Sequence, residues 1–231
     1  MARMSDVVLL DIEGTTTPIS FVFDVLFPYA AQRIPEWLRQ HGDEPAGRAA
    51  CDLVLKDAID DERRLPRIDA VLAVVRRQMA GDVKAAGLKQ LQGLVWEDGY
   101  TSGQIKGRVY ADVPECLRRW QAAGRRAAIY SSGSVLAQKL LFAHSEHGDL
   151  TPLLGAHFDT AVGGKRDAAS YRAIAERLGV APSAVTFATD IPAEAEAAKA
   201  AGMGAVVLMR PGNPPLPANL PFAVHADLTK I

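Results

Sequence analysis

The stretch Val7-Val8-Leu9-Leu10-Asp11-Ile12-Glu13-Gly14 decides the fold class of this chain. Four consecutive apolar residues bounded by polar ones are typical of a short buried strand, and the turn-forming residues from Gly14 to Pro18 end it. The sequence therefore predicts a strand over residues 7–10 that delivers Asp11 into a loop.

From Gly103 onward, short apolar runs alternate with amphipathic segments. We expect strands at 127–130, 158–162, 185–188 and 205–209, with helices at 113–123, 135–144, 168–178 and 192–201. Such alternation is typical of a parallel sheet covered by helices, here a Rossmann-like α/β core. The proline-rich tail at 211–221 is expected to be an extended surface segment.

Between the first strand and this alternating region the pattern is helical throughout. An amphipathic helix is indicated by apolar residues at intervals of three and four, namely Leu65, Ile68, Leu72, Val75 and Met79. Weaker patterns of the same kind cover 22–39, 45–59 and 83–94. These segments predict an inserted helical cap at residues 19–104, between the two parts of a discontinuous core at 1–18 and 105–231.

The composition narrows the class of protein. The 231 residues are 48% hydrophobic, so a sizeable core is expected. The formal net charge is −1, so we expect no basic surface that would bind nucleic acid or anionic membranes. Cys51 and Cys116 are too few for a disulfide framework or a zinc site. Because no apolar run approaches the roughly 18 residues of a membrane span, we expect a cytoplasmic protein.

Polar residues follow the predicted strands at the edge where a parallel sheet binds its ligands. They are Asp11 and Glu13 after the first strand, Ser131 and Ser132 after the second, Lys165 after the third, and Asp190 with Glu194 after the fourth. Each has a structural alternative: the aspartates and serines as turn formers or helix caps, and Lys165 and Glu194 as surface charges. Their order at successive strand ends favours a common site.

The residue types in this set suit phosphoryl transfer. Crowded carboxylates need a cation, and oxygen ligands beside a phosphate favour Mg²⁺. A lysine with hydroxyl groups and main-chain amides suits the phosphoryl oxygens. We therefore predict a magnesium-dependent phosphatase in which Asp11 is the nucleophile and Glu13 is a general acid and base.

Four segments of the chain resemble the four motifs of the haloacid dehalogenase superfamily. They are Asp11-Ile12-Glu13-Gly14-Thr15, Ser131-Ser132-Gly133-Ser134, Lys165 and Asp190. Further stretches resemble the enolase-phosphatase family within it, the acireductone synthases: Glu13 in place of the usual aspartate, Leu91-Gln92-Gly93-Leu94-Val95-Trp96, Gln138-Lys139-Leu140-Leu141-Phe142 and His157-Phe158-Asp159-Thr160.

This resemblance implies a two-step reaction on a small phosphorylated diketone, 2,3-diketo-5-methylthiopentyl 1-phosphate, which is enolised and then dephosphorylated. It implies one Mg²⁺ per chain, held by Asp11, the main-chain carbonyl of Glu13 and Asp190. It also implies substrate binding by Ser131, Ser132 and Lys165, and a monomeric protein. The segment around Lys165 departs from the family pattern, reading Gly164-Lys165-Arg166-Asp167-Ala168-Ala169-Ser170-Tyr171.

Three other functions remain open at this point. A phosphatase of the same architecture acting on phosphoglycolate or a sugar phosphate would share the phosphoryl site and differ in its cap. A metal-free dehalogenase would keep its activity in a chelator. A non-catalytic binding protein would have no need of a nucleophile together with metal ligands.

Overall fold

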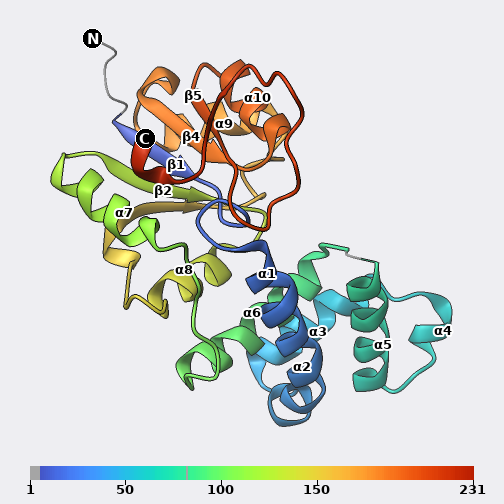
Figure 1. Cartoon of the computed structure of the whole chain (residues 1–231). Coiled ribbons are helices and arrows are strands. Elements are labelled where there is room, and N and C mark those ends of the chain that lie inside the picture. The colour runs from blue at the N-terminus through green and yellow to red at the C-terminus, as the bar shows by residue number, and fades with distance from the viewer. Residues whose placement is uncertain (1–5, 82) are drawn as a thin grey trace. The chain divides into compact units, whose positions relative to one another are not determined.

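The computed structural model describes residues 6–81 and 83–231, which form two compact units (Figure 1). One unit combines the chain up to Val22 with Lys106–Ile231, and the other is Phe23–Ile105. The first unit is thus assembled from two separated parts of the sequence.

The first unit is built on a six-stranded parallel sheet with strand order β3-β2-β1-β4-β5-β6. Its strands are β1 (Val7–Leu10), β2 (Arg126–Tyr130), β3 (Leu154–Phe158), β4 (Val185–Thr189), β5 (Gly204–Leu208) and β6 (Ala223–His225). All four residues of β1 are completely buried, as expected for a strand with neighbours on both sides and helices on both faces. The α/β core predicted from the sequence is confirmed.

Helices cover both faces of this sheet. They are α7 (Asp112–Ala122), α8 (Val135–Ala143), α9 (Ala168–Leu178) and α10 (Pro192–Ala200). Figure 1 shows α9 and α10 on one face and α7 and α8 on the other. Between α9 and the sheet, the ring of Tyr171 packs on those of Tyr130 and Phe187, with centroids 5.4 and 5.1 Å away. These rings belong to the buried core between α9 and strands β2 and β4.

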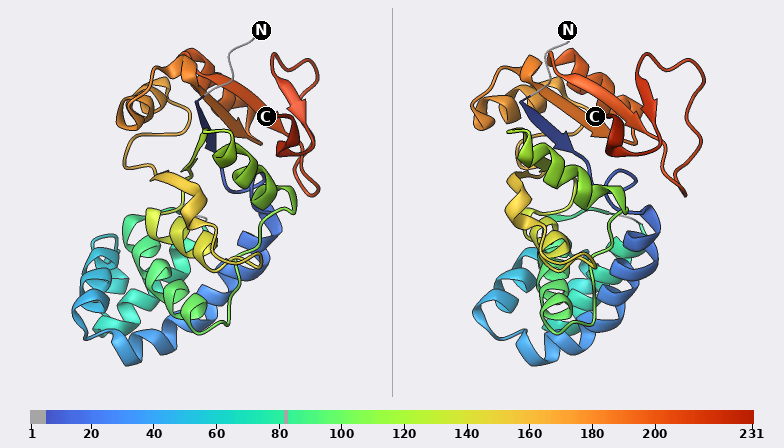
Figure 2. Two further views of the ribbon diagram at one scale, coloured as in Figure 1. Left: turned by 90° about the vertical axis from the view of Figure 1, so that its left-hand side faces the viewer. Right: turned by 60° about the vertical axis from the view of Figure 1, so that its left-hand side comes forward.

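The second unit is helical, as the further views in Figure 2 show. The chain leaves the first unit through α1 (Ile19–Phe21) and enters the second along a π-helical turn at Val22–Leu26. The helices of the second unit are α2 (Phe27–His41), α3 (Pro45–Leu55), α4 (Asp60–Arg63), α5 (Arg67–Ala80) and α6 (Ala86–Thr101). Gly87 lets α6 approach the backbone of α3, because a side chain there would collide with Val54. Within the same unit, Trp96 donates its indole hydrogen bond to the carbonyl of Leu26 at 2.9 Å.

Two parts of the sequence-based prediction need correction. The strand expected at 158–162 is wrong: β3 occupies Leu154–Phe158 and residues 159–162 form a turn after it. As an edge strand, β3 contains the exposed Gly155 and lacks a continuous apolar run. The short strand β6 and the four-residue helix α4 were not predicted, because elements of this length carry too little periodicity.

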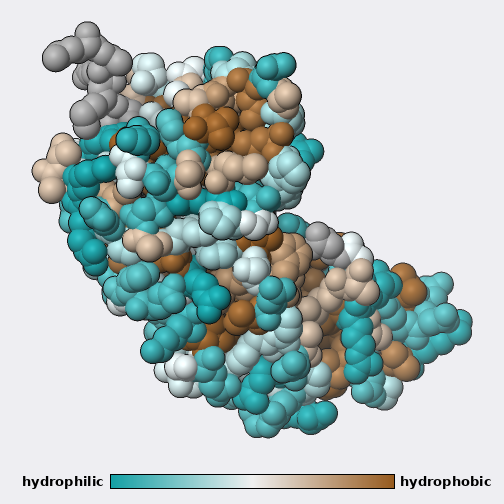
Figure 3. Space-filling model, viewed as in Figure 1, coloured by the Kyte–Doolittle hydropathy of each residue, from teal (hydrophilic) through white to brown (hydrophobic). Residues whose placement is uncertain are grey.

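The described residues include no helix long and apolar enough to cross a membrane. The face of the molecule in Figure 3 shows hydrophilic and hydrophobic residues interspersed.

Candidate active site

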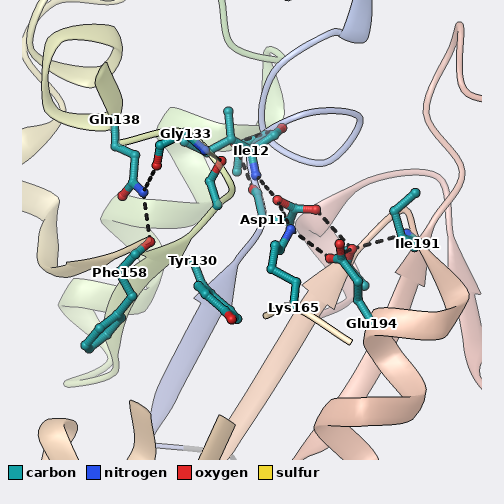
Figure 4. Close-up of polar contacts among 12 residues, drawn as sticks. Asp11, Ile12, Tyr130, Gly133, Gln138, Phe158, Lys165, Ile191 and Glu194 are labelled. Atoms are coloured by element: carbon teal, nitrogen blue, oxygen red, sulfur yellow. Dashed lines mark hydrogen bonds and ion pairs between the residues drawn. The ribbon is translucent and has the colours of Figure 1, made fainter. Parts of the chain in front are cut away.

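Strand register brings the candidate residues of the first unit together (Figure 4). Leu10 of β1 pairs with Ile129 of β2 on one side and with Ala188 of β4 on the other. Asp11 therefore leaves the sheet level with Thr189, and its amide still donates to the carbonyl of Ala188 at 2.9 Å. The parallel arrangement places the residues after β1, β2 and β4 at one edge.

Asp11 is 4% exposed, and both of its carboxylate oxygens accept hydrogen bonds. Oδ1 lies 2.7 Å from the amide of Ile12 and 2.6 Å from Nζ of Lys165. Oδ2 accepts from the hydroxyl of Thr189 at 3.1 Å. These contacts fix the orientation of a carboxylate that stands at the end of the central strand.

Lys165 lies between two carboxylates. Its Nζ is 2.6 Å from Asp11 and 2.7 Å from Oε2 of Glu194, with the ring of Tyr130 5.8 Å away. Burial alone would lower the pKa of Lys165, but the charges of Asp11 and Glu194 outweigh burial and hold this pKa above its ordinary value. The side chain of Lys165 is therefore a fixed ammonium. The main-chain carbonyl of Lys165 accepts a hydrogen bond from the hydroxyl of Tyr171 at 2.6 Å.

Thr189 connects the two carboxylates that contact Lys165. Its Oγ1 lies 3.1 Å from Asp11 and 3.0 Å from Glu194, and it accepts from the amide of Ile191 at 3.1 Å. Because a hydroxyl has one proton, it donates to one carboxylate at a time. Burial, followed by the negative charge of Asp11, raises the pKa of Glu194 to about 7.

Asp190 is 7% exposed and lies against Gly14 in the loop after β1. Burial first, and then the charge of Asp11, raises its pKa to about 7. Gly14 has φ +67°, and a side chain there would collide with the carboxylate of Asp190. The sequence therefore needs glycine here both for the turn and for the close approach of this carboxylate.

The donor set fits a small hard cation. The charge of Asp11 contributes to the raised pKa of Asp190, which shows that the two carboxylates repel each other. A divalent cation bound between them would compensate both charges. Oxygen-only ligands are those that Mg²⁺ prefers. Among residues 6–81 and 83–231, no three His, Cys, Asp or Glu side chains are grouped to hold a metal. The expected ligand set contains only two carboxylates, with a main-chain carbonyl as the third ligand.

The loop after β2 carries the predicted serines. Ser131 is 3% exposed and its Oγ accepts from the amide of Gly133 at 3.2 Å, whereas Ser132 is half-buried. Gln138 of α8 holds this loop: its Nε2 donates to the carbonyls of Gly133 and Phe158 at 2.9 and 2.8 Å (Figure 4). Ser134, not Ser131 or Ser132, caps α8 by accepting from the amide of Ala137.

The structure thus brings Asp11 and Lys165 into direct contact and places Asp190 against the loop that follows Asp11. Glu13, in that loop, is half-buried. Glu194 joins the network through Lys165. Sequence reasoning missed Thr189 and Gln138. Thr189 directly follows the strand predicted at 185–188 and precedes Asp190, so its position could have marked it. Gln138 stands in a stretch that resembles the enolase-phosphatase family, but nothing in the sequence assigned it a role.

Comparisons with known proteins agree with this geometry. A family model described as haloacid dehalogenase-like hydrolase matches residues 5–202. The enolase-phosphatase E1 of Synechococcus elongatus is 53% identical over 211 residues, 89% of each chain. That of Drosophila melanogaster is 45% identical, covering 91% of this chain and 86% of the relative.

Solved structures support the same assignment. The crystal structure of the UTR4 protein of Saccharomyces cerevisiae is 37% identical, with a TM-score of 0.82 over 98% of this chain and 100% of that one. A dehalogenase at 19% identity and a TM-score of 0.58 shares the fold. The chain belongs to the haloacid dehalogenase-like hydrolases and, within them, to the enolase-phosphatase E1 family.

Proposed function

We propose that this protein converts 2,3-diketo-5-methylthiopentyl 1-phosphate into 1,2-dihydroxy-3-keto-5-methylthiopentene and phosphate, as the enolase-phosphatase of methionine salvage. Family membership supports the reaction. The observation that carries the phosphatase step is the buried contact of Lys165 with Asp11, at 2.6 Å, beside the carboxylate of Asp190.

The phosphoryl group is transferred to Asp11 in this proposal. A carboxylate oxygen of Asp11 attacks phosphorus, the bond to the substrate oxygen breaks, and that oxygen takes a proton from Glu13. Water then attacks the aspartyl-phosphate, giving its proton to Glu13 and releasing phosphate and the free carboxylate. The enzyme returns to its starting state after each turnover.

Electrostatic repulsion is the main obstacle to this step. Two unit charges of the same sign about 4 Å apart repel by about 4 kcal/mol at an effective dielectric near 20. The ammonium of Lys165 offsets this repulsion because it already lies beside Asp11, and Ser131 and Ser132 are proposed to donate hydrogen bonds to phosphoryl oxygens. Positioning and neutralisation are the main requirements of phosphoryl transfer.

One Mg²⁺ would be held by Asp11, the carbonyl of Glu13 and Asp190. When bound, this ion supplies positive charge to the phosphoryl oxygens and polarises the dione oxygens for enolisation. The enolisation moves a proton from the carbon next to a carbonyl to the carbonyl oxygen, with no net change in atoms. Residues 19–104 are proposed as a cap that excludes water from the site. The protein is proposed to act as a cytoplasmic monomer.

The test uses the pure protein, the diketone phosphate and Mg²⁺, with phosphate release and enediol absorbance followed together. We expect both products from the wild type and neither after chelation of the metal. Asp11→Asn should release no phosphate, whereas Asp69→Asn, at an exposed position in α5, serves as the matched control. Phosphate release from phosphoglycolate or a sugar phosphate, but not from the diketone phosphate, would overturn the proposed substrate. A protein that hydrolyses none of these phosphoesters would overturn the proposal that it is a phosphatase.

A further inference from the structure

The loop after β1 is held by three residues far away in the sequence. Nδ2 of Asn213 donates to the carbonyl of Gly14 at 2.9 Å, and Nε of Arg210 donates to that of Thr15 at 2.9 Å. The amide of Tyr110 donates to the next carbonyl, that of Thr16, at 2.9 Å. Three successive carbonyls are therefore fixed from outside the loop.

Arg210 is itself a rigid anchor. It is 4% exposed, and its guanidinium forms two hydrogen bonds with Asp112, at 2.8 and 2.9 Å. The ring of Tyr110 lies 4.4 Å from its central carbon. Asn213 ends the turn that begins at Arg210, because its main-chain N–H donates to the main-chain carbonyl of Arg210 at 3.1 Å. The position of Asn213 is therefore fixed by a buried ion pair three residues away.

Both peptide groups around Gly14 are fixed. Its amide donates to the carbonyl of Thr17 at 2.8 Å, while its own carbonyl accepts from Asn213. In a planar trans peptide the carbonyl of Glu13 points opposite to the amide of Gly14, so it points away from Thr17. Glycine has a wider range of φ and ψ than other residues, so its two peptide groups need external restraints. The hydrogen bond to Thr17 holds the peptide group before Gly14, and the hydrogen bond from Asn213 holds the one after it.

The amide of Asn213 also faces the acidic part of the site. Its Oδ1 is buried and finds no hydrogen-bond partner among residues 6–81 and 83–231. A side-chain carbon on Gly14 would meet both this Oδ1, at 3.1 Å, and the carboxylate of Asp190. Asn213 and Asp190 thus lie against the same glycine.

We propose that Asn213 is a positioning residue for the Mg²⁺ site. By holding the Gly14 carbonyl it fixes the main chain after Gly14, so that the peptide group carrying the Glu13 carbonyl keeps the orientation given by the Gly14–Thr17 hydrogen bond. The inference rests on the proposed function, because it assumes that the Glu13 carbonyl binds the ion. The sequence offers no direct sign of this role, since Asn213 lies in a proline-rich tail about two hundred positions from the loop it holds.

The test is calorimetric titration of the substrate-free protein with Mg²⁺ alone. We expect Asn213→Ala to weaken the binding by about three- to tenfold, the effect of losing one partly buried hydrogen bond. Pro214→Ala, at the exposed neighbouring position, should bind Mg²⁺ like the wild type. In turnover, Asn213→Ala should need more Mg²⁺ for half-maximal rate and recover the wild-type kcat and KM at saturating Mg²⁺. A merely structural role would not give this rescue.

Thermal unfolding of each variant sets a titration temperature at which it is folded. Equal Mg²⁺ affinity in Asn213→Ala and the wild type would overturn the proposal, as would an equal loss in Pro214→Ala. A kcat that stays low at saturating Mg²⁺ would also overturn it. Failure of the wild type itself to bind Mg²⁺ would instead overturn the metal site of the proposed function.

Discussion

Lys165 places its ammonium nitrogen 2.6 Å from a carboxylate oxygen of Asp11, and both side chains are about nine-tenths buried. At this distance and burial the two charges stabilise each other strongly, and neither is compensated by bulk water. A second carboxylate, Glu194, lies 2.7 Å from the same nitrogen. The ammonium of Lys165 is therefore shared between two carboxyl groups before any phosphate or metal enters.

Lys165→Met tests this charge balance. Removing the ammonium leaves Asp11 facing the phosphate with less compensation, so we expect kcat/KM for phosphate release to fall about 10²–10³-fold, as for loss of other electrostatic donors. Steady-state kinetics at saturating Mg²⁺ measure the effect. Lys199→Met, at an exposed lysine of α10, is the control and should leave kcat/KM unchanged. Wild-type activity in Lys165→Met would remove Lys165 from the phosphoryl site.

Glu194→Gln tests how Lys165 is held. The substitution keeps the size of the side chain and its contact with Thr189, but removes the charge 2.7 Å from Nζ. We expect KM for the substrate to rise by about tenfold, because Lys165 loses one of its two charged partners. Glu196→Gln, at an exposed position on the same helix, is the control for the change in net charge. A loss confined to kcat would assign Glu194 to the chemical step.

The central strands could be predicted from the sequence because they are buried on both faces. Val7 to Leu10 form an unbroken apolar run, and the polar residue that follows is then placed at the sheet edge by topology alone. The same reasoning correctly expected a strand before Asp190. It failed at β3, an edge strand with an exposed glycine, where burial no longer dictates the residue types.

Contacts made by side chains across the fold could not be predicted in this way. Gln138 holds the loop at Gly133 from the first turns of α8, and Asn213 reaches Gly14 from the far end of the sequence. In both cases an amide donates to a main-chain carbonyl, an interaction open to almost any polar residue. Only the folded chain specifies which carbonyl is in reach.

His157 makes stability depend on pH. Burial, with a smaller contribution from the charge of Lys139, lowers its pKa from 6.5 to about 4, and its Nδ1 lies 3.3 Å from Oε1 of Gln138. Because the unfolded chain takes up this proton at higher pH than the folded one, the contribution of His157 is complete above pH 6.5 and is lost as pH falls towards 4.

We therefore expect the free energy of unfolding to decrease between pH 6.5 and 4 less steeply in His157→Gln than in the wild type. Urea unfolding at several pH values, followed by circular dichroism, measures the two slopes. His225→Gln controls for loss of a histidine elsewhere in the first unit. Parallel slopes in His157→Gln and the wild type would show that His157 titrates normally in the folded protein.

The ion pairs Arg210–Asp112 and Arg67–Asp52 have the same separation, 2.8 Å, and opposite environments. The first has side chains 3% and 15% exposed, and the second 42% and 60%. Asp112→Asn leaves the buried guanidinium of Arg210 without a counter-charge, and we expect it to cost about 3 kcal/mol of unfolding free energy. Asp52→Asn should cost less than about 1 kcal/mol, because water screens the exposed pair. Chemical denaturation of both variants measures the difference, and equal costs would contradict the view that burial, rather than distance, determines the strength of these pairs.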